Sequence, residues 1–201
     1  MLIVFEGIDG CGKNTQVKKV LAFLKQHKVK YKLHKYPTRK AKEVFAHLSG
    51  KKTIEPMNLA DIFAQDIIDE REKIEEEMEE GFVVICDRYL QSTLAYQGVN
   101  VGFEKLYARL EKSNGIVPDL VVLMDVDAKT SAKRKSAQKV PDRFEKDLAY
   151  LAKVRANYLK MMKREFYSYK YGLVDARRPV DEVFTDVVSL VEPLVVKKMK
   201  A

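Results

Sequence analysis

The feature that most constrains how this chain can fold is a glycine-rich segment near its beginning. A short apolar run over residues 2–5 leads into three glycines and a lysine, and apolar positions at helical spacing follow over residues 17–24. In an order of strand, glycine loop and helix, backbone N–H groups and the positive end of the helix face a polyphosphate. The segment therefore predicts a loop that binds nucleotide phosphates. Its members are Gly7, Ile8, Asp9, Gly10, Cys11, Gly12, Lys13, Asn14 and Thr15.

One position departs from the usual phosphate-loop pattern G-x-x-x-x-G-K-[ST]. Asn14 stands where a hydroxyl ordinarily coordinates magnesium, and Thr15 comes one residue late. An amide oxygen can ligate a hard cation or its water, although it cannot act as a hydroxyl does. We therefore expect phosphate binding to be retained, while the part that Asn14 plays toward the metal stays open.

Length and cysteine usage bound the class of protein. A chain of 201 residues without repeat or linker is expected to form a single domain over residues 1–201. Two cysteines, Cys11 and Cys86, are too few for a disulfide framework. No secretory signal pattern is visible, and no apolar run approaches the roughly 20 residues that cross a bilayer. We expect a soluble cytoplasmic protein that does not bind membranes.

The charge balance points toward phosphorylated partners. The formal net charge is +8, which suits nucleic acid, an acidic surface or small phosphorylated ligands. Zinc-ligand spacings and RNA-binding aromatic motifs are missing from the sequence, which argues against nucleic acid. Small nucleotides are the expected ligands.

Strand-like and helix-like segments alternate along the chain. Strands are expected over residues 31–36, 82–86, 120–124 and 169–174. Helical spacing covers residues 17–24, 59–80, 148–162 and 183–194, with 59–80 expected as one long helix. This alternation predicts an α/β fold, a parallel sheet with helices on both faces. Since ligands bind at the carboxyl ends of such strands, the loop, residues 37–39, Asp87-Arg88 and Asp125 should share one edge.

Asp87 and Arg88 follow an apolar strand and should lie beside the phosphate loop. A carboxylate there can hold magnesium directly or through water, and an arginine can neutralise a phosphate with two hydrogen bonds. The alternative is a salt bridge at the end of a strand.

A basic segment with little apolar periodicity spans residues 129–146. We predict a mobile lid, approximately residues 133–147, that closes over the nucleotides, excludes water and brings an arginine to the developing charge. The alternative is a solvated loop. The basic residues are Lys129, Lys133, Arg134, Lys135, Lys139, Arg143 and Lys146.

Three segments together resemble the thymidylate kinase family. They are Phe5-Glu-Gly-Ile-Asp-Gly-Cys-Gly-Lys-Asn-Thr-Gln16, Asp87-Arg-Tyr-Leu-Gln-Ser-Thr-Leu-Ala-Tyr-Gln97 and Pro141-Asp-Arg-Phe-Glu145. The middle segment is the most diagnostic, because its pattern is much rarer than a phosphate loop. The resemblance implies a P-loop NTPase fold of the nucleoside monophosphate kinase type, with a five-stranded parallel sheet. It also implies ATP-dependent phosphorylation of dTMP to dTDP, magnesium and a homodimer.

Site roles follow from the resemblance where positions match. Lys13 and the loop backbone hold the ATP phosphates, while Arg134 and Ala176 border adenine. Asp9 and Asp87 serve the metal. The residues implied around dTMP are Asp9, Tyr36, Arg39, Phe63, Arg88, Thr93, Tyr96 and Gln97. The catalytic residues implied are Lys13, Arg39, Arg88 and Arg143.

Two positions set this chain apart from the pattern of the family. Family members carry a catalytic basic residue either in the loop or in the lid; Gly10 stands at the loop position, so Arg143 of the lid is assigned that role. Ile67 stands where an arginine normally reaches thymine, one turn after Phe63 on the same helix face. We expect looser base discrimination, unless Arg71, one turn further along that face, reaches back toward the base. The alternative is that the helix is rotated and Ile67 belongs to the core.

The alternatives to thymidylate phosphorylation are few. One is a kinase for another monophosphate such as dUMP, or for a deoxynucleoside; Arg39 argues for an acceptor that already carries a phosphate. Another is a nucleotide-binding regulator without catalysis, in which Asn14 is the lesion. The regulator is disfavoured because the chain retains the full set of expected catalytic groups, Lys13, Asp87, Arg88 and Arg143.

Overall fold

The computed structural model describes residues 1–136 and 147–199, so residues 137–146 and 200–201 lie outside the described part. Its sheet has five strands in the order β2-β3-β1-β4-β5, and every neighbouring pair is parallel. This confirms the predicted α/β fold. The strands are β1 (Leu2–Glu6), β2 (Tyr31–Lys35), β3 (Val83–Asp87), β4 (Leu120–Asp125) and β5 (Tyr171–Asp175).

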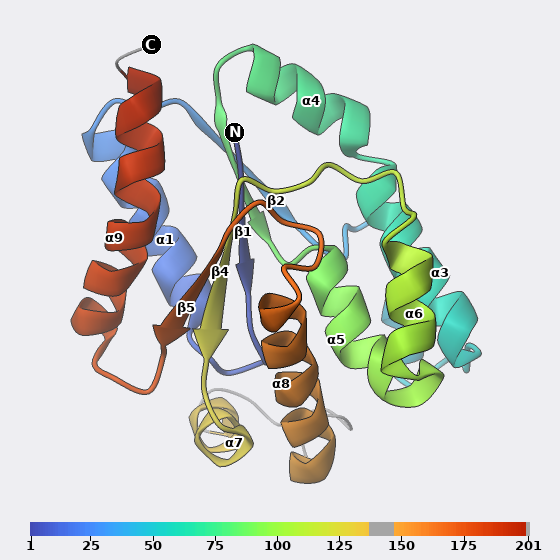
Figure 1. The fold of residues 1–201 in the computed structure, drawn as a ribbon. Coiled ribbons are helices and arrows are strands. Elements are labelled where there is room, and N and C mark those ends of the chain that lie inside the picture. Colours follow the sequence, from blue (N-terminus) through green and yellow to red (C-terminus); the bar gives the residue numbers. More distant parts are fainter. Residues whose placement is uncertain (137–146, 200–201) are drawn as a thin grey trace.

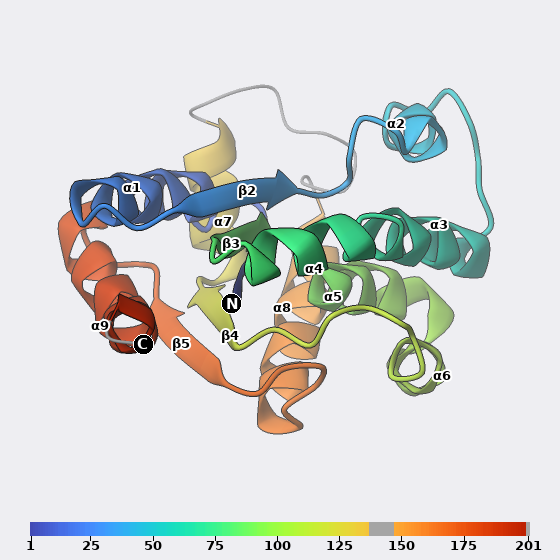
Figure 2. The ribbon, with the colours of Figure 1, turned by 90° about the horizontal axis from the view of Figure 1, so that it is seen from above.

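Helices cover both faces of the sheet, as Figures 1 and 2 show. Two helices, α1 (Lys13–Gln26) and α9 (Val180–Met199), pack together on one face. The other face carries α3 (Pro56–Ile68), α4 (Arg71–Glu79), α5 (Leu90–Val101), α6 (Phe103–Leu110) and α8 (Leu148–Lys163). Two short helices, α2 (Lys42–Leu48) and α7 (Ala128–Ser136), lie outside these layers.

The core lies along the central strands. All residues of β1 and β3 are buried, because helices cover both of their faces and their side chains form continuous apolar runs. The strands at the two edges are less covered, and Leu33 of β2 and Leu173 of β5 are exposed. The rigid centre of the sheet therefore carries the loop after β1 and the Asp87-Arg88 pair after β3.

The prediction of one long helix over residues 59–80 was wrong. The chain forms α3 and α4 with a turn at Asp69 and Glu70. Neither glycine nor proline marks this turn; polar contacts stabilise it instead, since Glu70 accepts a hydrogen bond from Lys40 at 2.7 Å. Such a break depends on tertiary contacts, which apolar periodicity does not reveal.

The basic segment was predicted from its low apolar periodicity as a mobile lid, and its first part forms the helix α7 (Ala128–Ser136). Asp127 initiates this helix, because its carboxylate accepts hydrogen bonds from the backbone N–H and the hydroxyl of Thr130 at 2.9 and 2.7 Å. Residues 137–146 of the predicted lid, Arg143 included, lie outside the described residues.

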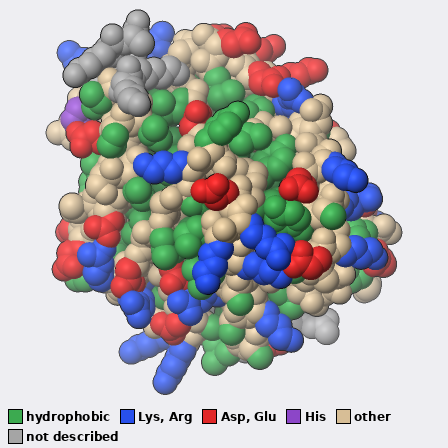
Figure 3. Space-filling model, viewed as in Figure 1, with side chains coloured by type: hydrophobic (Ala, Val, Ile, Leu, Met, Phe, Trp, Pro, Cys, Tyr) green, Lys and Arg blue, Asp and Glu red, His purple; other side chains and the backbone are tan. Residues whose placement is uncertain are grey.

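Charges are mixed on the surface shown in Figure 3. Basic and acidic side chains are interspersed there, with apolar side chains between them. The net positive charge therefore does not gather into one continuous basic surface on this face. Within the described ranges, no helix is long and apolar enough to cross a membrane.

Candidate active site

The phosphate loop joins β1 to α1 at the carboxyl edge of the sheet. Its glycines at 7, 10 and 12 have φ angles of +143°, +80° and +92°, which favour glycine. A Cβ at Gly7 would lie 2.6 Å from the Met124 carbonyl oxygen, so the loop passes too close to β4 for any side chain. Gly12 caps α1 without a side-chain hydrogen bond. The first turn of α1 can therefore present its N–H groups to an anion.

Helix α7 rests on the loop at its middle glycine. The Ser131 hydroxyl donates a hydrogen bond to the carbonyl oxygen of Asp9. A Cβ added to Gly10 would lie 2.6 Å from the Ser131 carbonyl oxygen. Glycine at position 10 is thus required for the helix to sit where it does.

Two lysines flank the buried carboxylate of Asp87. Lys13 Nζ lies 3.6 Å from Asp87 Oδ1, and Lys35 Nζ lies 3.1 Å from Asp87 Oδ2. Lys35 also donates to Asn14 Oδ1 at 3.3 Å. Asp87 Oδ1 is buried and has no hydrogen-bond partner among the described residues. A buried oxygen of this kind suits a further cation.

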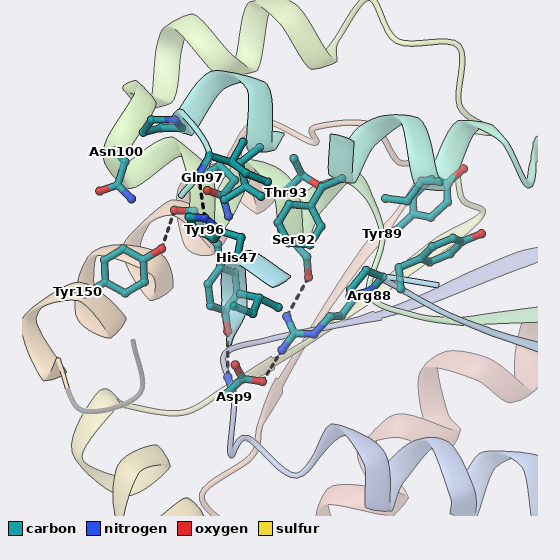
Figure 4. A pocket seen from close by; sticks show the side chains of 18 of the residues that line it. Asp9, His47, Arg88, Tyr89, Ser92, Thr93, Tyr96, Gln97, Asn100 and Tyr150 are labelled. Carbon is teal, nitrogen blue, oxygen red and sulfur yellow. Dashed lines mark hydrogen bonds and ion pairs between the residues drawn. The ribbon is translucent and has the colours of Figure 1, made fainter. Parts of the chain in front are cut away.

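Asp9 and Arg88 form the link between the loop and β3 (Figure 4). The guanidinium pairs with the Asp9 carboxylate through Nη2, donates to Ser92 Oγ at 3.1 Å through Nη1, and lies 5.2 Å from the centroid of the Tyr96 ring. The Asp9 N–H donates to Tyr96 Oη at 3.0 Å. Burial alone would raise the pKa of Asp9, but the charges of Arg88, Lys13 and Lys135 lower it well below its usual range. Asp9 therefore stays ionised at neutral pH.

Glu6 stabilises the segment that carries Arg88. Its Oε1 accepts from the backbone N–H groups of Tyr89 and Ser92 at 2.7 and 3.1 Å. Its Oε2 accepts from the hydroxyls of Ser92 and Tyr158 at 2.6 and 2.8 Å. Full burial raises the pKa of Glu6. Through Ser92, this carboxylate fixes the position of the Arg88 guanidinium.

A cavity of about 480 Å³ opens beside the Asp9–Arg88 pair, between α3, α5 and α7. Because α7 forms the first part of the predicted lid, it is called the lid helix below. Its volume and mixed lining fit a small ligand. Figure 4 shows side chains that line it. The predicted acceptor residues found in its wall are Asp9, Tyr36, Phe63, Arg88, Thr93, Tyr96 and Gln97.

Sequence reasoning missed several polar residues of the cavity. The wall includes His47 of α2, Asn100 of α5, Lys135 of α7 and Tyr150 of α8. Lys135 Nζ lies 3.6 Å from Asp9 Oδ2, and the Tyr150 hydroxyl donates to the Tyr96 carbonyl oxygen at 2.9 Å. Lys135 was visible only as one of several lysines in a basic run. His47 and Asn100 carry no local signal.

Other residues singled out from the sequence lie at different distances from the cavity. Ile67 lines it one turn after Phe63 and is 2% exposed, so it belongs both to the core and to the cavity wall. Arg39 is exposed and does not line it. The suggestion that Arg71 reaches back was wrong. Arg71 begins α4, does not line the cavity, and its guanidinium donates to Glu75 and to Asn114 in the segment before β4.

The lid helix also contacts the turn after β5. Arg134 donates to the carbonyl oxygens of Ala176 and Arg177 at 2.8 and 3.1 Å. The two segments expected around adenine are thus adjacent. Arg143, the predicted catalytic residue of the lid, cannot be placed, because it lies outside the described residues.

Metal-binding potential rests on few protein groups. Within residues 1–136 and 147–199, no three acidic, histidine or cysteine side chains gather around a common point. Magnesium at phosphate sites takes one or two carboxylates and completes its shell with phosphates and water. Asp87 Oδ1 fits that requirement, because it accepts no hydrogen bond among the described residues and only the Lys13 ammonium lies near it, at 3.6 Å, whereas Asp9 is engaged by Arg88.

Comparisons with known proteins agree with this geometry. A family model described as thymidylate kinase matches residues 5–187. A probable thymidylate kinase of Pyrobaculum calidifontis is 34% identical over 193 residues, covering 96% of each chain. One from Methanocaldococcus jannaschii is 36% identical over 189 residues, covering 94% of each. A thymidylate kinase of a Geobacillus species is 32% identical over 201 residues, covering 93% of each.

Proposed function

Because the chain belongs to the thymidylate kinase family, we propose that it transfers the γ-phosphoryl group of ATP to dTMP and releases dTDP and ADP. One observation carries this proposal. The phosphate loop and the 480 Å³ cavity share an edge of the sheet, and the Asp9–Arg88 pair joins them. A donor and an acceptor nucleotide could then meet at that pair.

The donor side is built from the loop and the lid helix. We assign the ATP phosphates to Lys13 and the loop backbone, and adenine to the neighbourhood of Arg134 and Ala176. Magnesium would be held by Asp87, with Asp9 as the second candidate carboxylate, and it would supply positive charge to the phosphates of ATP. The loop residues concerned are Gly7, Ile8, Asp9, Gly10, Cys11, Gly12, Lys13, Asn14 and Thr15.

The acceptor side is built from the cavity. Phe63 is assigned to stack on the base, and Arg88 and Arg39 to hold the dTMP phosphate. Asp9 keeps Arg88 charged and fixed, while Glu6 and Ser92 set its direction. The remaining contacts are assigned to Tyr36, Thr93, Tyr96 and Gln97.

The transfer itself needs positioning and charge neutralisation more than covalent help. An oxygen of the acceptor phosphate attacks the γ-phosphorus in line, and the bond to the β–γ bridging oxygen breaks as ADP leaves. Lys13, Arg39, Arg88 and Arg143 are proposed to share the charge that spreads over the transferred group. Preorganised cations of this kind stabilise the transition state more than the ground state.

A coupled ADP-release assay with ATP, magnesium and a panel of monophosphates tests the proposal. We expect turnover with dTMP and little with deoxynucleosides, because the acceptor side provides Arg88 for a phosphate. Lys13→Ala and Arg143→Ala should each lower kcat by about a hundredfold or more while leaving thermal unfolding unchanged. Near-normal turnover in either variant would contradict the assigned roles, and absence of dTMP turnover in the parent protein would contradict the function.

Three further properties are proposed. Base discrimination should be looser than in relatives that carry an arginine at the position of Ile67. The protein should form a homodimer, as the resemblance implies. Its cytoplasmic location, expected from the cysteine usage, stays a prediction that localisation of a tagged copy in cells would check.

A further inference from the structure

Lys35 occupies an unexpected position beside the donor site. It ends β2 and pairs in register with Asp87 on the adjacent strand, so the two side chains lie on the same face of the sheet. That face is the one covered by α1, which begins with Lys13 and Asn14. The Lys35 ammonium lies 3.1 Å from Asp87 Oδ2 and 3.3 Å from Asn14 Oδ1. A cation of the protein itself thus bridges the loop and the strand-end carboxylate.

The two groups that Lys35 bridges are the positions expected to meet magnesium. In a phosphate loop the residue after the lysine supplies a metal ligand, and the strand-end aspartate contacts the metal directly or through water. Here the first is an amide, whose oxygen accepts from Lys35. The oxygen of Asp87 that faces Lys13 is left without a hydrogen bond. The arrangement therefore holds two ammonium groups, from Lys13 and Lys35, against one carboxylate.

We propose that Lys35 is a further binding residue of the donor site, which contributes positive charge to the triphosphate and holds Asn14 and Asp87 in place. It supplies from the protein part of the charge that magnesium otherwise brings, so ATP binds with less reliance on the metal. This inference rests on the donor site proposed above. It concerns binding alone, and the transfer still uses magnesium.

Calorimetric titration of ATP, with EDTA and separately with saturating magnesium, tests the proposal. Lys35→Met keeps the length of the side chain and removes its charge. We expect the variant to bind metal-free ATP about tenfold more weakly, the equivalent of about 1.4 kcal/mol, which allows for solvent screening of an exposed lysine. Binding with magnesium should weaken by less than about threefold, since the metal replaces the missing charge.

Two matched variants separate this role from a general loss of charge. Lys35→Arg should bind metal-free ATP within about threefold of the parent, because it keeps the charge. Lys32→Met removes a lysine of the same strand that lies over the Phe82 ring, and should change neither Kd. A Kd for metal-free ATP within twofold of the parent in Lys35→Met would overturn the proposal. So would equal losses with and without magnesium.

The link to Asn14 is tested by a double-mutant cycle. If the two residues act as a unit, Lys35→Met should weaken the binding of metal-free ATP by less in an Asn14→Thr background than in the parent. Independent residues would give additive losses of binding free energy. Additive losses would remove Asn14 from the proposal. Lys13→Ala serves as the reference for the donor site. If Lys13→Ala weakens ATP binding and Lys35→Met does not, only this inference fails; if neither does, the donor site itself is wrongly placed.

Discussion

Glu6 shows how a residue that does not line the cavity can hold residues of the acceptor side in place. Its carboxylate is fully buried and accepts from two backbone N–H groups and two hydroxyls. These donors include Ser92, which orients Arg88. Burying an ionisable side chain is tolerated here because every donor around it is satisfied.

Removing that carboxylate should destabilise the protein. Glu6→Ala leaves several buried donors without an acceptor, and we expect the free energy of unfolding to fall by about 3 kcal/mol. Denaturant unfolding measures it. Glu6→Gln keeps one acceptor oxygen and the shape of the side chain, so its free energy of unfolding should fall by clearly less. A loss below about 0.5 kcal/mol in Glu6→Ala, the range of ordinary surface changes, would show that the network contributes little.

Ile67 is the residue from which we expect looser recognition of the base. It lines the cavity beside Phe63, and its side chain cannot donate a hydrogen bond to a base. A site without one of its base-reading hydrogen bonds rejects analogues less strongly, so we expect dTMP to be preferred over dUMP, dCMP and dGMP by less than about a thousandfold in kcat/KM.

Steady-state kinetics with the four monophosphates checks this prediction. Ile67→Arg should raise the preference for dTMP, while Ile67→Leu, which keeps the apolar wall, should leave the order unchanged. A preference above a thousandfold in the parent protein would mean that other residues of the cavity read the base fully.

At the scale of elements, the last turn of α3 and the turn that follows it hold the loop that carries Arg39. Asp66 is buried and accepts from the Thr38 N–H and hydroxyl at 2.7 and 2.5 Å. Glu70 accepts from Lys40 at 2.7 Å. Two carboxylates at the helix break therefore anchor the residues on either side of Arg39.

Loss of the Asp66 carboxylate should weaken the binding of dTMP and leave the binding of ATP unchanged. Asp66→Ala is expected to raise the KM for dTMP about tenfold, the effect of one hydrogen bond of about 1.4 kcal/mol, with the KM for ATP unchanged. Asp66→Asn keeps an acceptor and should largely restore the parent value. Asp69→Ala, which removes an exposed carboxylate of the same turn, is the control. An equal rise in both KM values would indicate a general structural defect.

A pH-dependent link joins α6 to α8. Hydrogen bonds from Arg164 and Lys160 lower the pKa of Glu104 from its ordinary 4.5 to about 2. A carboxyl whose pKa is lower in the folded state stabilises that state above its unfolded pKa. The contribution of Glu104 is therefore present above about pH 4.5 and is lost as the pH falls toward 2.

Comparing Glu104→Gln with the parent at several pH values isolates this effect. The parent should unfold at a higher denaturant concentration near pH 7, and the two proteins should converge near pH 2. Because Glu104 is exposed, the difference is small and weakens with salt. Glu79→Gln, an exposed position of α4, should show no such convergence. A gap between parent and Glu104→Gln that stays constant over this range would contradict the assignment.

At the scale of the whole molecule, the chain itself predicts the order of strands and helices better than it predicts the cavity wall. Continuous apolar runs at β3 and β4 and the glycine loop are local signals, and all three reappear as expected. The helix break at Asp69 and Glu70 depends on contacts between distant segments. So does the position of His47 and Asn100 in the cavity wall. Local periodicity carries no record of such contacts.

Assembly is a property of the complete molecule, and the proposed homodimer can be tested directly. Light scattering coupled to gel filtration should give a mass twice the 23.1 kDa of the chain. Closed two-fold dimers are the commonest assemblies of soluble proteins, in keeping with the expectation from the resemblance. A mass of one chain that does not change with protein concentration would contradict it.

The contact between Gly10 and Ser131 limits how this enzyme could be redesigned. A family member with its basic residue in the loop needs room for a long side chain at position 10, and here α7 fills that room. Moving the cation into the loop by the single exchange Gly10→Arg should therefore displace the lid helix and lower activity. In protein design or in evolution, a change from a basic residue in the lid to one in the loop therefore needs a second change that moves α7 away from position 10.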